Sequence, residues 1–76
     1  MRQRRVPHLT LRELTVLRLI AAGKENSAIA SELAIRIGTV KNHIGKILIK
    51  LNIAEHAPTH ARRQAVAVAR QKGLIL

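Results

Sequence analysis

The chain has 76 residues, no cysteine and no aromatic residue of the Phe, Trp or Tyr type, and its fourteen Lys and Arg against four acids give a net charge of +10. A chain of this length forms one small domain, here with an aliphatic core, and the lack of cysteine excludes disulfides and thiolate metal sites. The charge predicts a polyanionic partner, nucleic acid first and an anionic membrane second, while no apolar run reaches the ~20 residues of a membrane span.

Basic residues mark the beginning of the chain. Residues 1–8 are expected to form a flexible arm, in which Arg2, Arg4 and Arg5 either enter a minor groove or contribute only general charge. No apolar stretch of signal-peptide type follows this arm. We therefore expect a soluble, intracellular protein.

The first two helices are short. One is expected over residues 10–22, because its first residue and Glu13 stand at the spacing of a capping box. The other is expected over residues 27–34, with Asn26 or Ser27 as its N-cap. Glu13 falls toward the core side of its helix, as a cap or as a buried partner of an arginine.

A third helix, over residues 39–51, has the strongest periodic pattern in the chain. Its apolar residues from Val40 to Leu51 recur at i, i+4, i+7, i+8 and i+11, which places them on one stripe. The first turns of this helix hold several polar residues with hydrogen-bonding groups, whereas its second half is mainly apolar. The residues expected to point outward are Asn42, Gly45, Lys46 and Ile49, flanked by Lys41, His43 and Lys50.

A long loop, residues 52–60 with Pro58, precedes a last helix expected over residues 61–72 and ended by Gly73. This helix is apolar on most of its circumference, and its small residues cannot all face a single core. We therefore expect it to form a homodimer interface. The residues assigned to that interface are Ala61, Ala65, Val66, Val68 and Ala69.

Two short helices joined by a tight turn, the second with a basic outer face, predict a helix-turn-helix within an all-α, four-helix bundle domain. Residues 33–54 contain no acid, and a helix is read in the major groove mainly through its first residues. Lys41 can donate to guanine O6 and N7, and Asn42 can pair with adenine N6 and N7. The residues expected to contact the DNA backbone are Arg36, Thr39, His43, Lys46 and Lys50.

The stretch LTLRELTVLRLIAAGKENSAIASELAIRIGTVKNHIGKILIKL, followed later by RRQAVAVARQKGLI, resembles the DNA-binding domain of the LuxR/NarL/GerE family of bacterial transcription regulators. The resemblance covers residues 9–53 and the last helix, and the length resembles that of stand-alone GerE-like members. It implies a four-helix domain over residues 9–76, dimerisation through the last helix, and base-reading positions at Lys41, Asn42 and Gly45.

Three departures from the family pattern stand out. Gly45 has no side chain where relatives often carry one that reads a base. Arg36 and Ile37 replace small or acidic residues before GTVK, so that Arg36 could add a phosphate contact. The connection over residues 54–61 is several residues longer than usual, which leaves the position of the last helix open.

The remaining residues give no sign of catalysis. No nucleophile and base, and no pair of carboxylates, stand at a useful spacing, so we expect neither an enzyme nor a cofactor. We expect no metal either, because the histidines lack ligand spacing on a common face. Leu11 and Leu14 point away from the apolar stripe and are either incidental or a contact for a protein such as RNA polymerase. The histidines are His8, His43, His56 and His60.

We conclude that the sequence predicts a sequence-specific, double-stranded DNA-binding transcription regulator that acts as a homodimer and is cytoplasmic, in association with the nucleoid. Two alternatives remain. A sigma factor's promoter-recognition domain has a related helix-turn-helix, and a cationic helical protein could bind nucleic acid, RNA included, without sequence preference. The lack of base-stacking aromatic residues argues against single-strand recognition.

Overall fold

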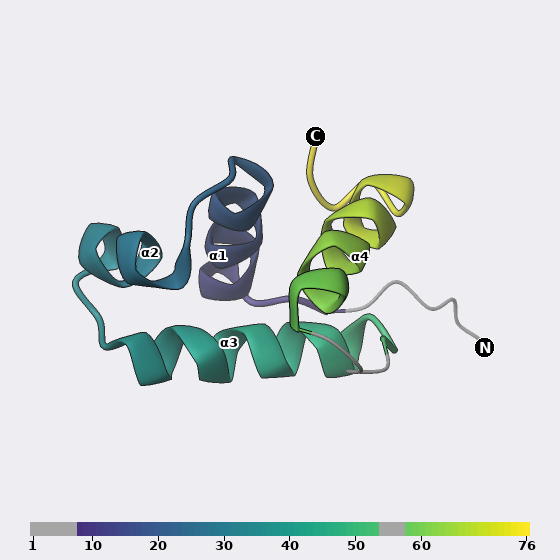
Figure 1. The fold of residues 1–76 in the computed structure, drawn as a ribbon. Coiled ribbons are helices and arrows are strands. Elements are labelled where there is room, and N and C mark those ends of the chain that lie inside the picture. Colours follow the sequence, from purple (N-terminus) through teal and green to yellow (C-terminus); the bar gives the residue numbers. More distant parts are fainter. Residues whose placement is uncertain (1–7, 54–57) are drawn as a thin grey trace.

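The computed structural model describes residues 8–53 and 58–76, which form four helices (Figure 1). Helix α3 runs across the molecule and packs against α1, α2 and α4, which all lie on one side of it. The all-α fold predicted from the sequence is confirmed. The arm with Arg2, Arg4 and Arg5 lies outside the described residues, as does His56 of the long loop. The helices are α1 Leu11–Ala21, α2 Asn26–Leu33, α3 Ile37–Lys50 and α4 Pro58–Gln71.

One aliphatic core joins all four helices. Its largest fully buried side chains come from α1, α2 and α3, and α4 contributes small buried residues. Small side chains on α4 allow its backbone to approach closely, so that a core without aromatic residues still closes. The buried apolar residues are Val16, Leu17, Ile29, Ala30, Val40, Ile47, Leu48, Leu51, Ala61, Ala65, Val66, Ala69 and Ile75.

The small residues of α4 do face a single core, contrary to the expectation from which a dimer interface on α4 was predicted. Four of the five residues assigned to it are buried in the chain's own core, and the fifth, Val68, packs against that core. One core therefore accommodates all five, because α4 crosses both α1 and α3 and so presents more than one side to the interior. The four buried residues are Ala61, Ala65, Val66 and Ala69.

All four helices end in the same way. Each is followed by a residue with positive φ, and the next N–H donates back to a carbonyl five residues earlier, which is the Schellman arrangement. The predicted role of Gly73 at the end of α4 is confirmed. In the turn between α2 and α3 the left-handed residue is Ala34, with φ 56° and ψ 45°. The residues with positive φ are Gly23, Ala34, Asn52 and Gly73.

The beginnings of the helices follow two different rules. At α1 the predicted capping box is confirmed: Glu13 N–H donates to Thr10 Oγ1 at 3.0 Å, and Thr10 N–H donates to Glu13 Oε1 at 2.9 Å. At α2 the predicted side-chain cap is wrong. The N-cap is Glu25, which makes no side-chain cap bond, and Asn26 is already helical and accepts a hydrogen bond from Arg62 instead.

Helices α3 and α4 begin earlier than the sequence predicted. The main-chain oxygen of Arg36 accepts the N–H of Thr39 at 3.0 Å and of Val40 at 3.1 Å, so α3 starts two residues before Thr39. Pro58, predicted to lie in the loop, is the first residue of α4. The first helical position suits proline, because its fixed φ is helical and its missing N–H would have no partner there.

The expected pair of outward-facing leucines on α1 is only half right. Leu11 is 83% exposed, whereas Leu14 is half-buried and packs against the core. The two residues therefore do not form a joint exposed patch. Of the pair predicted to contact another protein, only Leu11 is exposed. Ile49 of α3 is exposed as expected, with 79% of its surface accessible.

Candidate nucleic-acid interface

The buried side of α3 determines which of its side chains face outward. Val40, Ile47 and Leu48 are at most 3% exposed and belong to the core that α3 shares with the other helices, which lie on one side of it (Figure 1). At 3.6 residues per turn, the opposite side of α3 presents the polar residues of its first half and, from its second half, Ile49. The exposed residues there are Lys41, Asn42, Lys46 and Ile49, with Gly45 partly exposed among them.

The first turn of α3 offers main-chain donors. Ile37 and Gly38 are exposed, and as the first two helical residues their N–H groups have no acceptor within the helix. The N–H of Thr39, which we expected to be available for a phosphate, is instead bonded to Arg36. The helix dipole makes such an N-terminus favourable for an anion, and no acid lies in this first turn.

Two glycines leave bare backbone on this face. A Cβ added at Gly38 or at Gly45 would meet no atom within 4 Å, so the protein's own packing does not require glycine at either position. Their effect is on the outside, where a missing side chain lets another molecule approach the backbone closely. The two positions are seven residues apart, which places them on the same side of the helix.

Lys50 differs from the other lysines of α3. Its Nζ donates to Glu13 Oε1 at 2.8 Å, and the Glu13 side chain is only 3% exposed. The expectation that Glu13 caps α1 and enters a buried pair is therefore met, but with a lysine rather than an arginine. This pair joins the start of α1 to the end of α3. Because its charge is already balanced, we leave Lys50 out of the proposed phosphate contacts.

The same pair fixes the charge state of Glu13. Burial alone would raise the pKa of this carboxyl, but the hydrogen bond from Lys50, the main-chain bond from Thr10 and the positive charge of Lys50 together lower it below its ordinary value of 4.5. Glu13 is therefore ionised at neutral pH. A charged residue in the core is tolerated here because each of its partners stabilises the carboxylate.

The remaining predicted contacts lie around this face. Lys46 and Arg36 are exposed, while His43 and Thr39 are partly buried. Among these residues none has an ion-pair partner in the described part of the chain.

The structural role of Arg62 was not predicted from the sequence. Arg62 of α4 donates from Nη2 to the main-chain oxygen of Lys24 at 3.0 Å and from Nη1 to Asn26 Oδ1, and so ties α4 to the start of α2. The partners are separated by 38 and 36 positions, and no local pattern signals such a contact. Among the described residues, no group of three or more His, Asp or Glu could hold a metal ion, and no helix is long and apolar enough to cross a membrane.

Comparison with known proteins identifies the relatives of this chain. The family of bacterial regulatory proteins called the LuxR family matches residues 7–69, which include α1, α2, α3 and most of α4. The chain is 46% identical over 72 residues to the transcriptional regulatory protein LiaR of Bacillus subtilis, covering 92% of this chain and 31% of that protein. It is 43% identical over 65 residues to the transcriptional regulatory protein DesR of the same organism, covering 86% and 30%.

A third relative, the response regulator protein VraR of Staphylococcus aureus, is 46% identical over 67 residues, covering 88% of this chain and 29% of that protein. The chain thus spans about three tenths of the length of these curated relatives. The family predicted from the sequence is confirmed.

Proposed function

Since this chain belongs to the LuxR family of bacterial regulatory proteins, we propose that it binds double-stranded DNA in a sequence-specific manner and that α3 enters the major groove. A helix-turn-helix of this family is a DNA-binding element of transcription regulators, and the family match favours a regulator over a sigma factor. The observation that carries the proposal is the outer face of α3, which is polar at its start, free of acids and uncovered by the other described helices.

Within this proposal the contacts divide into two kinds. Asn42 pairs with an adenine and Lys41 with a guanine, because their exposed amide and ammonium groups match those base edges. Gly45 lets the helix backbone approach the groove floor. The phosphate contacts come from the N–H groups at the start of α3 and from the polar side chains around it. These side chains are Arg36, Thr39, His43 and Lys46.

We further propose that two copies assemble on paired half-sites about one helical turn apart. A chain of net charge +10 repels a second copy in solution, and DNA phosphates remove that repulsion. The assembly therefore depends on DNA, and the buried residues of α4 are not its interface. Sedimentation at high micromolar concentration should give a monomer without DNA and a 2:1 complex on a duplex with two half-sites. A 1:1 complex on that duplex would contradict this part of the proposal.

Selection from a random duplex library tests the central claim. It should return a motif of two related half-sites, and Asn42→Ala should then cost on the order of 1–3 kcal/mol at one base pair. Gln64→Ala, which removes an exposed amide from α4, should leave affinity unchanged. Nonspecific binding predicts a different result: no motif would emerge, and Asn42→Ala would weaken binding to selected and random DNA equally.

A further inference from the structure

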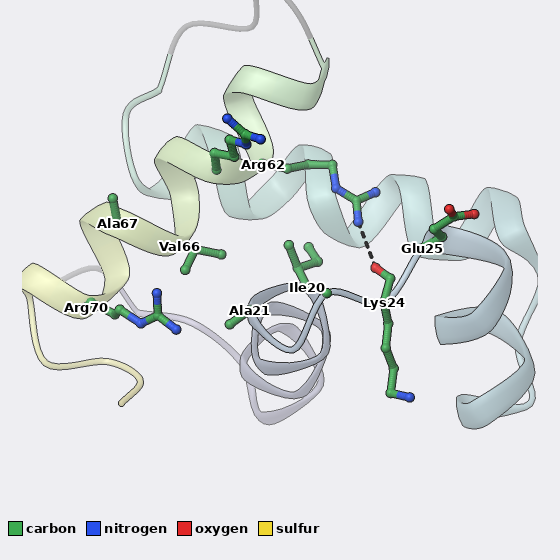
Figure 2. Close-up of a pocket in the computed structure, with 10 residues that line it drawn as sticks. Ile20, Ala21, Lys24, Glu25, Arg62, Val66, Ala67 and Arg70 are labelled. Carbon is green, nitrogen blue, oxygen red and sulfur yellow. Dashed lines mark hydrogen bonds between the residues drawn. The ribbon is translucent and has the colours of Figure 1, made fainter.

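A cavity of about 370 Å³, open to solvent, lies between the end of α1 and α4 (Figure 2). Its walls come from α1, from the turn that leads into α2, and from α4, so it lies on a different part of the molecule from the outer face of α3. Its volume falls within the range of about 300–1,000 Å³ that is typical of small-molecule sites.

Three arginines contribute to the lining of this cavity. Arg62 is held by the main-chain oxygen of Lys24 and by Asn26, and Arg70 Nε donates to the main-chain oxygen of Leu76 at 2.8 Å. A guanidinium has five N–H donors, so both groups keep further donors after these bonds. Arg63 is the third. Two of the three cations are thus oriented by main-chain oxygens before any ligand arrives, which reduces the entropy lost on binding.

The other walls are mainly apolar. Ile20 and Ala21 of α1 and Val66 and Ala67 of α4 contribute to the lining, and Val66 points toward α1 (Figure 2). Basic and apolar groups lie together here, whereas a site for a bare phosphate would need only the basic ones. Such a lining suits a molecule with two parts, an anionic group and an apolar body.

The charge of the cavity is positive overall. Glu25 is the one acid in its lining. The Nζ of Lys24 pairs with Glu32 at 3.5 Å and points away from the cavity, so this lysine contributes its main chain (Figure 2). The three arginines therefore exceed the single carboxylate, and the binding of an anion is electrostatically favourable.

We propose that this cavity binds a small organic anion, a carboxylate or phosphate ester carried on an apolar body such as a ring. Its anionic group accepts hydrogen bonds from Arg70 and Arg62, and its body packs against Ile20 and Val66. Arg62 also bonds to Lys24 and Asn26, so the site borders the contact between α4 and the start of α2.

NMR titration of the ¹⁵N-labelled chain tests the site with three probes: benzoate, inorganic phosphate and benzyl alcohol. Benzoate should shift the amide signals of Lys24, Asn26, Ala67 and Arg70 in a saturable manner. Phosphate lacks the apolar body and benzyl alcohol lacks the charge, so each should bind at least about fivefold more weakly than benzoate.

Two variants and one control complete the test. Arg70→Gln removes a proposed hydrogen-bond donor and should weaken benzoate binding about fivefold or more, whereas Arg63→Gln removes only a nearby charge and should weaken it less. Arg12→Gln removes the same charge from an exposed position of α1 outside the cavity and should change nothing. Equal affinity for phosphate and benzoate, or equal weakening by all three substitutions, would overturn the proposal and leave only general attraction of anions to a basic chain.

Discussion

At Gly45 the requirements of folding and of DNA binding differ. A glycine inside a helix lowers stability, and nothing in the protein occupies the space that a side chain would fill. The sequence nevertheless has glycine at a partly exposed position between Asn42 and Ile49. If the face of α3 that contains it lies against the floor of a groove, the missing side chain benefits binding and not the fold.

Gly45→Ala should therefore have two effects of opposite sign. The free energy of unfolding should rise by about 0.5–1 kcal/mol, because alanine is the better helix former. Affinity for the selected duplex should fall by on the order of 1–3 kcal/mol, the usual cost of an added group in a close-packed interface. Chemical denaturation measures the change in stability, and titration with the selected duplex measures the change in affinity. Higher stability with unchanged affinity would show that Gly45 does not face the DNA.

The pair of Glu13 and Lys50 makes stability depend on pH in a defined direction. The folded-state pKa of Glu13 lies below the ordinary 4.5, so its stabilising effect is complete above that value and is lost as the pH falls through the lowered pKa. Lys50→Met leaves a buried carboxylate without its cation, which should raise the pKa of Glu13 above the ordinary value. The variant should then lose stability at neutral pH and regain part of it as the pH falls through the raised pKa.

The loss at pH 7 should be about 1–3 kcal/mol, below the full cost of breaking a buried pair because Lys50 is 34% exposed. Urea denaturation from pH 4 to pH 8 provides the measurement. Lys24→Met is the matched control: it breaks the exposed pair with Glu32, at 3.5 Å, and should cost no more than about 0.5 kcal/mol at any pH. Parallel pH profiles for the wild type and Lys50→Met would contradict the assignment.

Among the elements, the turn between α2 and α3 depends on an unfavourable residue. Ala34 adopts the left-handed conformation that costs an L-residue roughly 1–2 kcal/mol. The turn persists because Ile35 N–H donates to Ala30 at 3.0 Å and Ala34 N–H to Ser31 at 3.3 Å, which closes the end of α2. These bonds fix the direction in which α3 leaves the turn.

Ala34→Gly should relieve that strain and raise the free energy of unfolding by about 0.5–1 kcal/mol, part of the gain being offset by the greater freedom of glycine in the unfolded chain. Ala28→Gly, in the exposed interior of α2, should instead lower it by about the same amount. Thermal or urea unfolding of the two variants gives the comparison. Destabilisation by both substitutions would mean that the left-handed conformation of Ala34 carries little strain.

How well the sequence predicted each element depends on how local its determinants are. The boundaries of α1 were predicted to within a residue, because the capping box of Thr10 and Glu13 is a local signal. The beginnings of α3 and α4 were missed, since Arg36 caps α3 with its main chain and Pro58 is read equally well as part of a loop. The residues on the outer face of α3 were predicted from its apolar stripe, because the positions of both faces depend only on helical geometry.

Contacts between distant residues could not be predicted in this way. Lys50 has the same sequence context as any basic residue at the end of a helix, and only the folded chain brings it to Glu13, 37 positions away. The bond from Arg62 of α4 to the main-chain oxygen of Lys24 likewise joins residues far apart in the sequence and could not be predicted. The buried small residues of α4 were misjudged because the width of its apolar surface was visible in the sequence, but not the two helices that cover it.

For the molecule as a whole, DNA binding can depend on the total positive charge or on basic residues at particular positions. The chain carries +10, and basic residues lie on α1 and α4 as well as on α3. A long-range field alone would make every basic residue equally important for DNA binding. Direct phosphate contacts would make a few of them far more important than the rest.

Arg36→Gln and Lys72→Gln distinguish these possibilities, because each removes one positive charge from an exposed position. Arg36 lies at the start of α3, whereas Lys72 follows α4 at the end remote from α3 (Figure 1). If position decides, Arg36→Gln should reduce the slope of log K against log salt by about 1 and weaken selected and random duplexes alike, while Lys72→Gln should leave the slope unchanged. Fluorescence anisotropy measures both slopes between roughly 50 and 200 mM salt, a range over which counterion release changes DNA affinity strongly. Equal slopes for the two variants would mean that Arg36 contacts no phosphate and that the total charge alone brings this chain to DNA.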